Sequence, residues 1–321
     1  MNFMKKSSIL LSALVLTMLL ASCCATAPER PAAFVPAADR IIKDEPIDWD
    51  KAYQLHPGIL HLSLERTTPR INKIQLVRVD LTIPGLSLTA SKRATEWGLP
   101  MPGFPEMTIR TVRETTRDFM RHAQERGRNM VVAFNGSGWG PWCDPWTHTF
   151  GCDLPFLVTD GIVVSDHKRN RPVFVFTKDG QWDIRDLAPG DDISNFQTAV
   201  GGYGYLVKEG KLADNSRKEL HPRTAYGLSK DKRYFYVLIV DGRQPGYSEG
   251  AAGGDLADLF LEIGDVWTAI GMDGGGSSTL VTWDPQTQKV QKLNHQRGGG
   301  ERWNGCNLGF CIEPQPTETD K

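Results

Sequence analysis

Residues 273–279, DGGGSST, place one carboxylate, three consecutive glycines and three hydroxyl groups in seven positions. Three glycines in a row carry a large entropic cost on folding, so the run needs a structural reason. One interpretation is a tight hairpin in which Asp273 bonds its own backbone. The other is an anion cradle, in which backbone amides and side-chain hydroxyls turn toward a bound group. The cradle would use Gly274, Gly275, Gly276, Ser277 and Ser278, with Asp273 beside them.

The setting of this run excludes the common nucleotide-binding loops. The flanking residues 265–272 and 278–283 have the composition of β-strands. A phosphate-binding loop GxxxxGK[ST], or a dinucleotide loop GxGxxG, would lead into a helix. Neither pattern is present at this position. The sequence therefore predicts a strand–loop–strand unit.

A second polar cluster precedes the glycine run in the chain. Arg223 stands before one predicted strand, and Asp241, Gly242 and Arg243 follow the next. An arginine beside an aspartate is commonly a simple ion pair. The alternative is that both guanidinium groups bind a phosphate or carboxylate, with Asp241 as an orienting or catalytic group. His221 could line the same site.

Two further segments combine glycines with groups that bind sugars or phosphates. Asn135 ends a hydrophobic run, and Trp139 and Trp142 follow it. Tryptophan faces stack well on sugar rings, but these two could equally form a small satellite core. Arg302 and Asn307 lie beside another glycine run, which taken alone reads as a polar surface loop.

The sequence shows no metal-binding motif. Its seven histidines are scattered, without HxH or HExxH spacing. We therefore expect no metal and no other cofactor, although Asp241 and Asp273 are the residues that could bind a divalent ion. The formal net charge of −1 gives no overall attraction to nucleic acid or to an acidic membrane.

The N-terminus is typical of an exported bacterial lipoprotein. Two lysines precede an apolar run that is too short for a comfortable membrane span, and this run ends in Leu-Ala-Ser before Cys23. We interpret residues 1–22 as a lipoprotein signal peptide and Cys23 as the lipidated residue. The alternative is an ordinary signal peptide cleaved further on. Either leader takes the protein out of the cytoplasm, and a lipid would anchor it in the cell envelope, at the periplasmic side or the cell surface.

The mature chain is expected to contain one tether and one domain. Residues 23–49 are rich in alanine and proline and predict a tether. No second linker follows, so residues 50–321 are expected to form a single domain.

Strand signals dominate that domain. Short β-rich runs lie at 73–82, 129–136, 155–164, 171–182 and 233–242, with hairpin turns expected at TDG and KDG. Two helices are predicted, at 111–127 and at 253–264, the second with Asp255 as N-cap and Gly264 at its end. The expected fold class is α+β, with a large strand-rich mixed sheet as core and a few covering helices.

Four cysteines remain beyond the anchor, and in an oxidising compartment they suggest two disulfides. The nearest-neighbour pairs are Cys143–Cys152 and Cys306–Cys311, although three connectivities are possible. The spacings within these pairs do not favour a zinc site.

In chain order, four segments resemble the phosphodiester glycosidase, or uncovering-enzyme-like, family. They are AFNGSGW at 133–139, the long segment from RTAYG to FLEIG at 223–264, AIGMDGGGSSTLV at 269–281 and GERWNGCNLGF at 300–310. This family includes secreted bacterial proteins and the enzyme of the lysosomal pathway that removes N-acetylglucosamine from a phosphodiester on mannose. The resemblance covers roughly residues 75–312 and is strongest from Arg223 to Val281.

The resemblance implies hydrolysis of a sugar-1-phosphodiester on a glycoconjugate or polysaccharide, with release of free sugar and a phosphomonoester. By position in the motifs, the candidate site comprises Asn135, Arg223, Asp241, Gly242, Arg243, Asp273, Gly274, Gly275, Gly276, Ser277, Arg302 and Asn307. Arginines and loop amides would hold the phosphate. We expect Asp273 to act as base or nucleophile and Asp241 as its partner or as an orienting group.

The chain departs from the family pattern in two places. Ser137 stands where the family usually has a second glycine, with Trp139 following Gly138, and residues 249–252 replace a Gly-Ala-Thr-Leu-like stretch. These departures bear on the sugar recognised more than on the reaction class. Two other functions remain: a metal-dependent phosphodiesterase that cuts P–O, and a non-catalytic glycan-binding lipoprotein.

Overall fold

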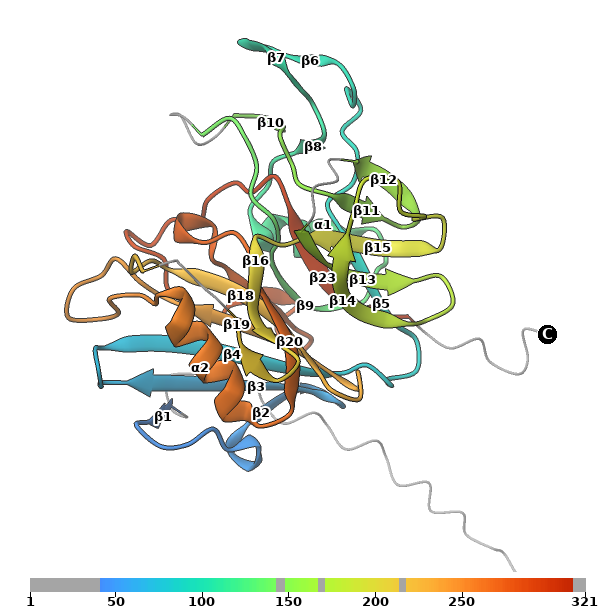
Figure 1. Cartoon of the computed structure of the whole chain (residues 1–321). Helices are drawn as coiled ribbons and strands as arrows, with labels where there is room; N and C mark the ends of the chain where they lie inside the picture. Colours follow the sequence, from blue (N-terminus) through green and yellow to red (C-terminus); the bar gives the residue numbers. More distant parts are fainter. Residues whose placement is uncertain (1–40, 143–147, 167–170, 214–217, 314–321) are drawn as a thin grey trace, which may run out of the picture. The chain divides into compact units, whose positions relative to one another are not determined.

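The structure, a computed structural model, describes residues 41–142, 148–166, 171–213 and 218–313. All of them belong to one compact unit, residues 34–321. The described part of the chain has two α-helices, and strands make up most of the other regular structure (Figure 1). The predicted α+β class therefore holds only coarsely, because the protein is mostly β.

The largest sheet has nine strands. In spatial order they are β1 (Ile41–Lys43), β3 (Ile59–Arg66), β4 (Asn72–Asp80), β19 (Tyr234–Val240), β18 (Arg223–Ser229), β20 (Val266–Gly271), β16 (Gly204–Lys208) and β17 (Lys211–Leu212), with β2 (Tyr53–His56) also paired to β3. The β1–β3 pair is parallel and the others are antiparallel. The sheet is therefore mixed, as predicted.

Two five-stranded antiparallel sheets accompany it. The first contains β12 (Ile162–Ser165), β11 (Leu157–Thr159), β15 (Phe196–Gly201), β13 (Arg171–Thr177) and β14 (Trp182–Leu187). The second contains β22 (Lys289–Lys292), β21 (Leu280–Asp284), β9 (Met130–Asn135), β23 (Asn307–Ile312) and β5 (Leu86–Ala90). Shorter elements are the pairs β10 (Phe150–Gly151) with β8 (Thr111–Val112) and β6 (Pro100–Met101) with β7 (Phe104–Thr108), and the 3-10 turns η2 (Trp49–Lys51) and η3 (Gly275–Ser277).

A buried aromatic cluster joins these three sheets. Phe235 of β19 stacks on Phe174 of β13, with the ring centroids 4.2 Å apart. Phe310 of β23 lies 5.4 Å from the same Phe235 ring. All three side chains are buried, so one hydrophobic core connects the strands that carry the candidate site.

Helix α2 (Gly253–Ile263) packs on strands of the nine-stranded sheet, including β16 and β20 (Figure 1). Phe260 fits against Gly227 of β18, where a Cβ would lie 2.8 Å from its ring. The helix ends at Gly264, whose φ of 93° is the left-handed conformation expected of a C-terminal glycine. The N-cap prediction was wrong by three residues: Ala252 is the N-cap, and Asp255 accepts a hydrogen bond from its amide at 2.7 Å.

Helix α1 (Thr116–Glu125) is shorter than the predicted 111–127. Thr115 is its N-cap and accepts a hydrogen bond from the Asp118 amide at 3.0 Å. The residues before it form β8, which pairs with β10. The helix begins where a capping side chain satisfies its first amides, whereas the apolar periodicity continues into the preceding strand.

Both predicted hairpins are confirmed. Asp160 and Gly161, between β11 and β12, have φ values of 50° and 75°, as a tight hairpin turn requires. Gly180 has a φ of 81° in the turn between β13 and β14.

The predicted Cys306–Cys311 disulfide is wrong, because both residues are free, buried thiols. Cys306 immediately precedes β23 and Cys311 lies near its end, so the two are an odd number of residues apart. Strand alternation therefore turns Cys306 toward the main core and Cys311 toward a separate cluster beneath α1. Cys152 is also a free thiol, with its Sγ 3.4 Å from the Met101 sulfur, and its predicted partner Cys143 lies outside the described residues.

Candidate active site

The glycine-rich segment connects two sheets. Strand β20 before it lies in the nine-stranded sheet, whereas β21 after it lies in the second five-stranded sheet. Between them, Gly275–Ser277 form one turn of 3-10 helix. The hairpin interpretation is wrong because β20 and β21 do not pair with each other.

Asn135, at the end of β9, holds this crossing segment in place. Its Nδ2 donates to the Asp273 carbonyl at 2.8 Å. Its Oδ1 accepts from the Thr224 hydroxyl at 2.7 Å and from the Thr279 amide at 3.1 Å. The side chain is buried and its polar atoms are engaged within the protein. Asn135 was predicted to bind substrate. The structure places it where its hydrogen bonds link the two sheets.

The glycine run allows two arginines to close onto the backbone. A Cβ at Gly276 would lie 2.7 Å from the guanidinium of Arg302. Gly275 has a φ of 65°, and a Cβ there would lie 3.2 Å from the guanidinium of Arg243. At Gly274 a Cβ would meet a backbone carbonyl oxygen at 2.6 Å. Side chains at these positions would push the arginines or the chain away.

Most of the predicted amide cradle is already occupied by the protein itself. The Gly274 amide donates to Asp273 Oδ1 at 2.9 Å, and the Gly275 amide donates to the Pro222 carbonyl at 2.8 Å. The amides of the two serines that follow close the 3-10 turn at 3.3 Å. Positive charge at this site therefore comes from side chains and not from the loop amides.

Three arginines line one cavity with Asp273, and this cavity has a volume of about 390 Å³. Arg223 begins β18, Arg243 follows β19, and Arg302 precedes β23. The remaining lining residues are Trp142, Tyr203, His221, Met272, Gly274 and Gly275. The structure thus brings Asp273 together with all three arginines that the sequence proposed.

Two features single out Arg243 and Arg302 as candidate functional residues: the backbone conformation of Arg243 and the crowding of positive charge around Arg302. Arg243 has a φ of 60°, an uncommon conformation for a residue with a side chain and one that concentrates at functional sites. Burial lowers the pKa of the Arg302 guanidinium, and Arg243 lowers this pKa further, whereas Asp273 opposes the shift. A bound anion would relieve this crowding of positive charge.

His221 lines the same cavity and contacts the arginine wall. Its Nδ1 accepts a hydrogen bond from Arg243 Nε at 3.3 Å, so Nε2 carries the proton in the neutral ring. Burial, followed by Arg243 and Arg223, lowers the pKa of His221, which keeps it neutral at neutral pH. In the sequence, the position of His221 two residues before Arg223 was the feature that indicated a place in this site.

Asp241 lies in a neighbouring cavity of about 330 Å³, so the structure separates the two predicted catalytic carboxylates. Arg243, Gly275 and Arg302 belong to the walls of both cavities. The arginine pair is therefore the common boundary between Asp241 and Asp273.

Every oxygen of the Asp241 carboxylate has a partner. Oδ1 accepts from Asn294 Nδ2 and Oδ2 from the His295 amide, each at 2.9 Å. Burial raises the pKa of Asp241 to about 6, and these two hydrogen bonds offset part of the shift. Such bonds fix residues 294–295 against the strand end that carries Arg243.

The other predicted loop residues have different surroundings. Gly242 is a packing glycine, because a Cβ would lie 2.7 Å from the Cα of Gly250. The hydroxyls of Ser277 and Ser278 are buried, and neither has a hydrogen-bond partner within the described structure. Ser278 also lines the cavity of Asp241.

The two predicted sugar-stacking tryptophans form a stacked pair. Their ring centroids are 5.2 Å apart and the planes differ by 8°. Trp139 is buried, whereas Trp142 is 53% exposed and lines the arginine cavity. Tyr203, which the sequence analysis did not select, lines that cavity as well, because β16 lies beside β20 in the nine-stranded sheet.

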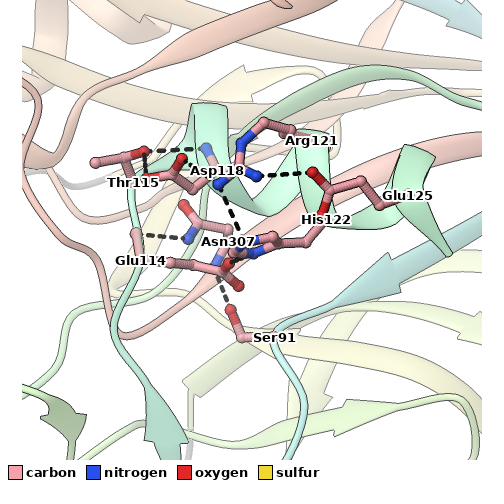
Figure 2. A network of polar contacts seen from close by, with 8 residues as sticks. All are labelled: Ser91, Glu114, Thr115, Asp118, Arg121, His122, Glu125 and Asn307. Atoms are coloured by element: carbon pink, nitrogen blue, oxygen red, sulfur yellow. Dashed lines mark hydrogen bonds and ion pairs between the residues drawn. The ribbon is translucent and has the colours of Figure 1, made fainter.

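Asn307 lies in a different polar network. Figure 2 shows it bonded to the Ser91 hydroxyl and the Glu114 carbonyl, near the ion pair between Glu114 and His122. Its Oδ1 accepts from the Thr116 hydroxyl at 2.8 Å, at the start of α1. Asn307 is completely buried, so the structure places this predicted binding residue among contacts that tie β23 to α1.

Among the described residues, no three His, Cys, Asp or Glu side chains lie close enough together to bind a metal ion. The described helices include none with the length and hydrophobicity needed to cross a membrane.

Fold and site together define a strand-rich protein whose cavity combines a carboxylate with a group of arginines, suited to an anionic ester. The sequence model of the phosphodiester glycosidase family matches residues 128–310, more than half of the chain. The chain therefore belongs to the phosphodiester glycosidase family. No curated protein sequence matches it at a significant level.

Solved structures share the fold at low sequence identity. The zebrafish N-acetylglucosamine-1-phosphodiester alpha-N-acetylglucosaminidase catalytic domain, auto-inhibited by its pro-peptide, aligns with a TM-score of 0.55 and 18% identity, over 84% of this chain and 87% of that one. A hypothetical protein from Synechocystis aligns with a TM-score of 0.55 and 13% identity, over 84% of this chain and 64% of that one. A putative exported protein from Burkholderia pseudomallei gives 0.53 and 12%, over 75% and 74%.

Proposed function

We propose that this protein hydrolyses the C1–O bond of a sugar-1-phosphodiester, on a glycoconjugate or polysaccharide outside the cytoplasm. The observation that carries the proposal is the cavity that holds Asp273 together with Arg243 and Arg302. Arg223 also lines this cavity, and its guanidinium donates hydrogen bonds to the Ala251 and Glu219 carbonyls. Planar guanidinium groups match phosphate oxygens, and a carboxylate beside them can act on the sugar carbon. Membership of the family supports this reaction in general.

In the proposed reaction, the phosphate lies against Arg243 and Arg302 and sugar C1 faces Asp273. Asp273 either attacks C1 or removes a proton from the attacking water. The C1–O bond breaks and its electron pair stays on the phosphate oxygen. The water hydroxyl ends on C1 and its proton is released. The two arginines stabilise the departing phosphomonoester, so little acid assistance is needed.

Asp241 is better suited to a positioning role than to direct attack. Its two oxygens are held by Asn294 and His295, and it lines the neighbouring cavity. Through these bonds it fixes the strand end that is followed by Arg243. The proposal therefore assigns the reacting carboxylate to Asp273 and the support of the arginine wall to Asp241.

Hydrolysis in ¹⁸O water tests which bond is cut. A screen of sugar-1-phosphodiesters with mass spectrometry of both products should place the label in the sugar. Label in the phosphomonoester would instead show a phosphodiesterase that cuts P–O. Binding of sugar phosphates without any turnover would favour the non-catalytic glycan-binding protein.

The matched variants are Asp273→Asn and Asp258→Asn, the second on the exposed side of α2. Asp273→Asn should lower kcat by about three orders of magnitude or more while the circular dichroism spectrum is retained. Asp258→Asn should behave as wild type. Near-wild-type turnover in Asp273→Asn would contradict the assignment of the reacting carboxylate.

We also propose that the protein is lipid-anchored in the cell envelope through Cys23. The support is the apolar leader that ends in Leu-Ala-Ser before Cys23. Full-length protein should fractionate with membranes, and a Cys23→Ala variant should lose both the lipid mass and this fractionation. Wild-type protein without lipid on the mature N-terminus would contradict the anchor and leave the reaction proposal untouched.

A further inference from the structure

A larger cavity adjoins the arginine cavity. Its volume is about 580 Å³, and the two cavities share Trp142 and Tyr203. Most of its remaining wall is apolar: Met107, Pro141, Pro155, Phe156, Val173 and Leu187. Pockets of this size and lining are typical binding sites for small hydrophobic groups.

Gly138 and Trp139, from the segment in which this chain departs from its family's sequence pattern, form part of this wall. A Cβ at Gly138 would lie 1.7 Å from the Tyr203 hydroxyl oxygen, so only glycine allows Tyr203 to lie here. The preceding Ser137 donates its hydroxyl to the Gly201 carbonyl. The following Trp139 stacks on Trp142. The Ser-Gly-Trp segment at 137–139 thus builds the junction between the two cavities.

Charged groups are few in this cavity. Asp153 and Arg171 are the charged residues among those that line it. The Arg171 guanidinium lies 5.9 Å from the centre of the Tyr203 ring. A further sugar ring would need a denser set of hydrogen-bonding groups than these residues supply. The lining therefore favours an apolar occupant, with polar groups that orient it.

The position of Arg302 indicates which part of a phosphodiester substrate would lie near this cavity. The guanidinium of Arg302 lies 5.5 Å from the centre of the Trp142 ring. A phosphodiester has two ester groups, and the sugar occupies the one that faces Asp273. With the phosphate held by Arg302, the second ester group would be close to Trp142, which lines both cavities.

We propose that this cavity binds the alcohol part of the substrate, and that the substrates are sugar-1-phosphodiesters of a hydrophobic aryl or alkyl alcohol. This inference rests on the proposed function, because it assigns the two sides of the phosphate. The hydrophobic phosphomonoester is then the product that leaves through the apolar cavity.

The first test uses binding alone and needs no turnover. Isothermal titration of the full chain with benzyl phosphate and with methyl phosphate compares one ring with one methyl group. Burial of the ring should make benzyl phosphate bind about ten- to a hundredfold more tightly. Equal affinities would overturn the inference.

The second test compares turnover of the benzyl and methyl esters of one sugar-1-phosphate. Wild-type kcat/KM should favour the benzyl ester by a similar factor. Leu187→Phe adds volume inside the cavity and should remove most of this preference. The matched control is Leu212→Phe, at an exposed position of β17, which should keep the preference.

The two tests separate the inference from the proposed function. Turnover of both esters without preference overturns the apolar site and leaves the reaction intact. Absence of turnover on either ester, with benzyl phosphate still the tighter ligand, overturns the reaction and supports the apolar site. If Leu187→Phe does not fold, the two measurements on the wild-type chain still decide the matter.

Discussion

At the scale of single residues, the arginines define the character of the site. Arg302 rests against Gly276 and lies near Arg243, in a position where burial already lowers its pKa. Two guanidinium groups held close together are a costly arrangement unless an anion joins them. The glycines are therefore needed mainly because Arg243 and Arg302 pack against them. Their own backbone amides are a secondary reason.

Gly276→Ala should displace Arg302, because the new Cβ would lie 2.7 Å from its guanidinium. We expect kcat/KM to fall about a hundredfold, comparable to losing one transition-state donor. Gly254→Ala is the control, since a Cβ there meets nothing within 4 Å. Steady-state kinetics and phosphate titration check both variants. Unchanged phosphate affinity in Gly276→Ala would contradict the role given to Arg302.

Asp241 should make stability depend on pH. Its pKa is raised from 3.8 to about 6 on folding, so its contribution is fully present below pH 3.8 and is lost as pH rises through 6. The loss amounts to about 3 kcal/mol at neutral pH. Asp241→Asn cannot ionise and should escape this loss, although its amide fits the His295 N–H less well.

Urea unfolding between pH 4 and pH 7.5 checks this prediction. The free energy of unfolding of Asp241→Asn, minus that of wild type, should increase with pH. The test is the sign of the change of this difference with pH. Its absolute size is not informative, because the variant also loses a hydrogen bond at every pH. A flat difference would mean that the buried carboxylate titrates as it does in the unfolded chain. Asp258→Asn serves as the surface control.

At the scale of elements, strand alternation decides where side chains go. Leu308 and Phe310 of β23 enter the main core, as does Cys306 just before the strand, whereas Cys311 faces the cluster beneath α1. Burial raises the pKa of both thiols to about 12. Sequence proximity suggested a disulfide, but neighbours an odd number of residues apart point to opposite faces of a strand.

Thiol labelling checks this arrangement. Alkylation in denaturant without reductant, followed by peptide mapping, should label Cys152, Cys306 and Cys311. In the folded protein the same residues should react slowly, because they are buried and their thiolates are disfavoured. A linked peptide containing Cys306 and Cys311 would contradict the described geometry of β23.

At the scale of the whole described unit, one aromatic cluster supports three sheets, and the site lies on segments that run between them. Asn135 from one sheet holds the segment that leaves another. Disturbing the cluster should therefore affect stability and activity together, even though the cluster touches no substrate.

Phe235→Ala tests this dependence. Loss of the ring that stacks on Phe174 and contacts Phe310 should reduce the free energy of unfolding by about 3–5 kcal/mol. Phe235→Leu keeps most of the volume and should lose less. Urea unfolding of both variants gives the values, and a loss below about 1 kcal/mol in Phe235→Ala would contradict a shared core.

The sequence by itself determined the family, the main strands and both hairpin turns, and it selected Asp273, Arg223, Arg243 and Arg302 as candidate site residues. These follow from local patterns, since alternation, turn residues and ordered motifs are written along the chain. The start of α1 was harder to predict from the sequence, because the apolar periodicity continues to the N-terminal side of the capping residue Thr115.

Only the tertiary structure decided how those residues are used. Pairing of β20 and β21 with strands of different sheets turned an expected hairpin into a crossing segment. The tertiary structure also placed Asn307 in the network beside α1 and Asp241 in a different cavity from Asp273. It brought Tyr203 and Trp142 to the cavity of Asp273. The physical reason is that strand pairing between distant segments selects which faces meet, and no local pattern encodes that choice.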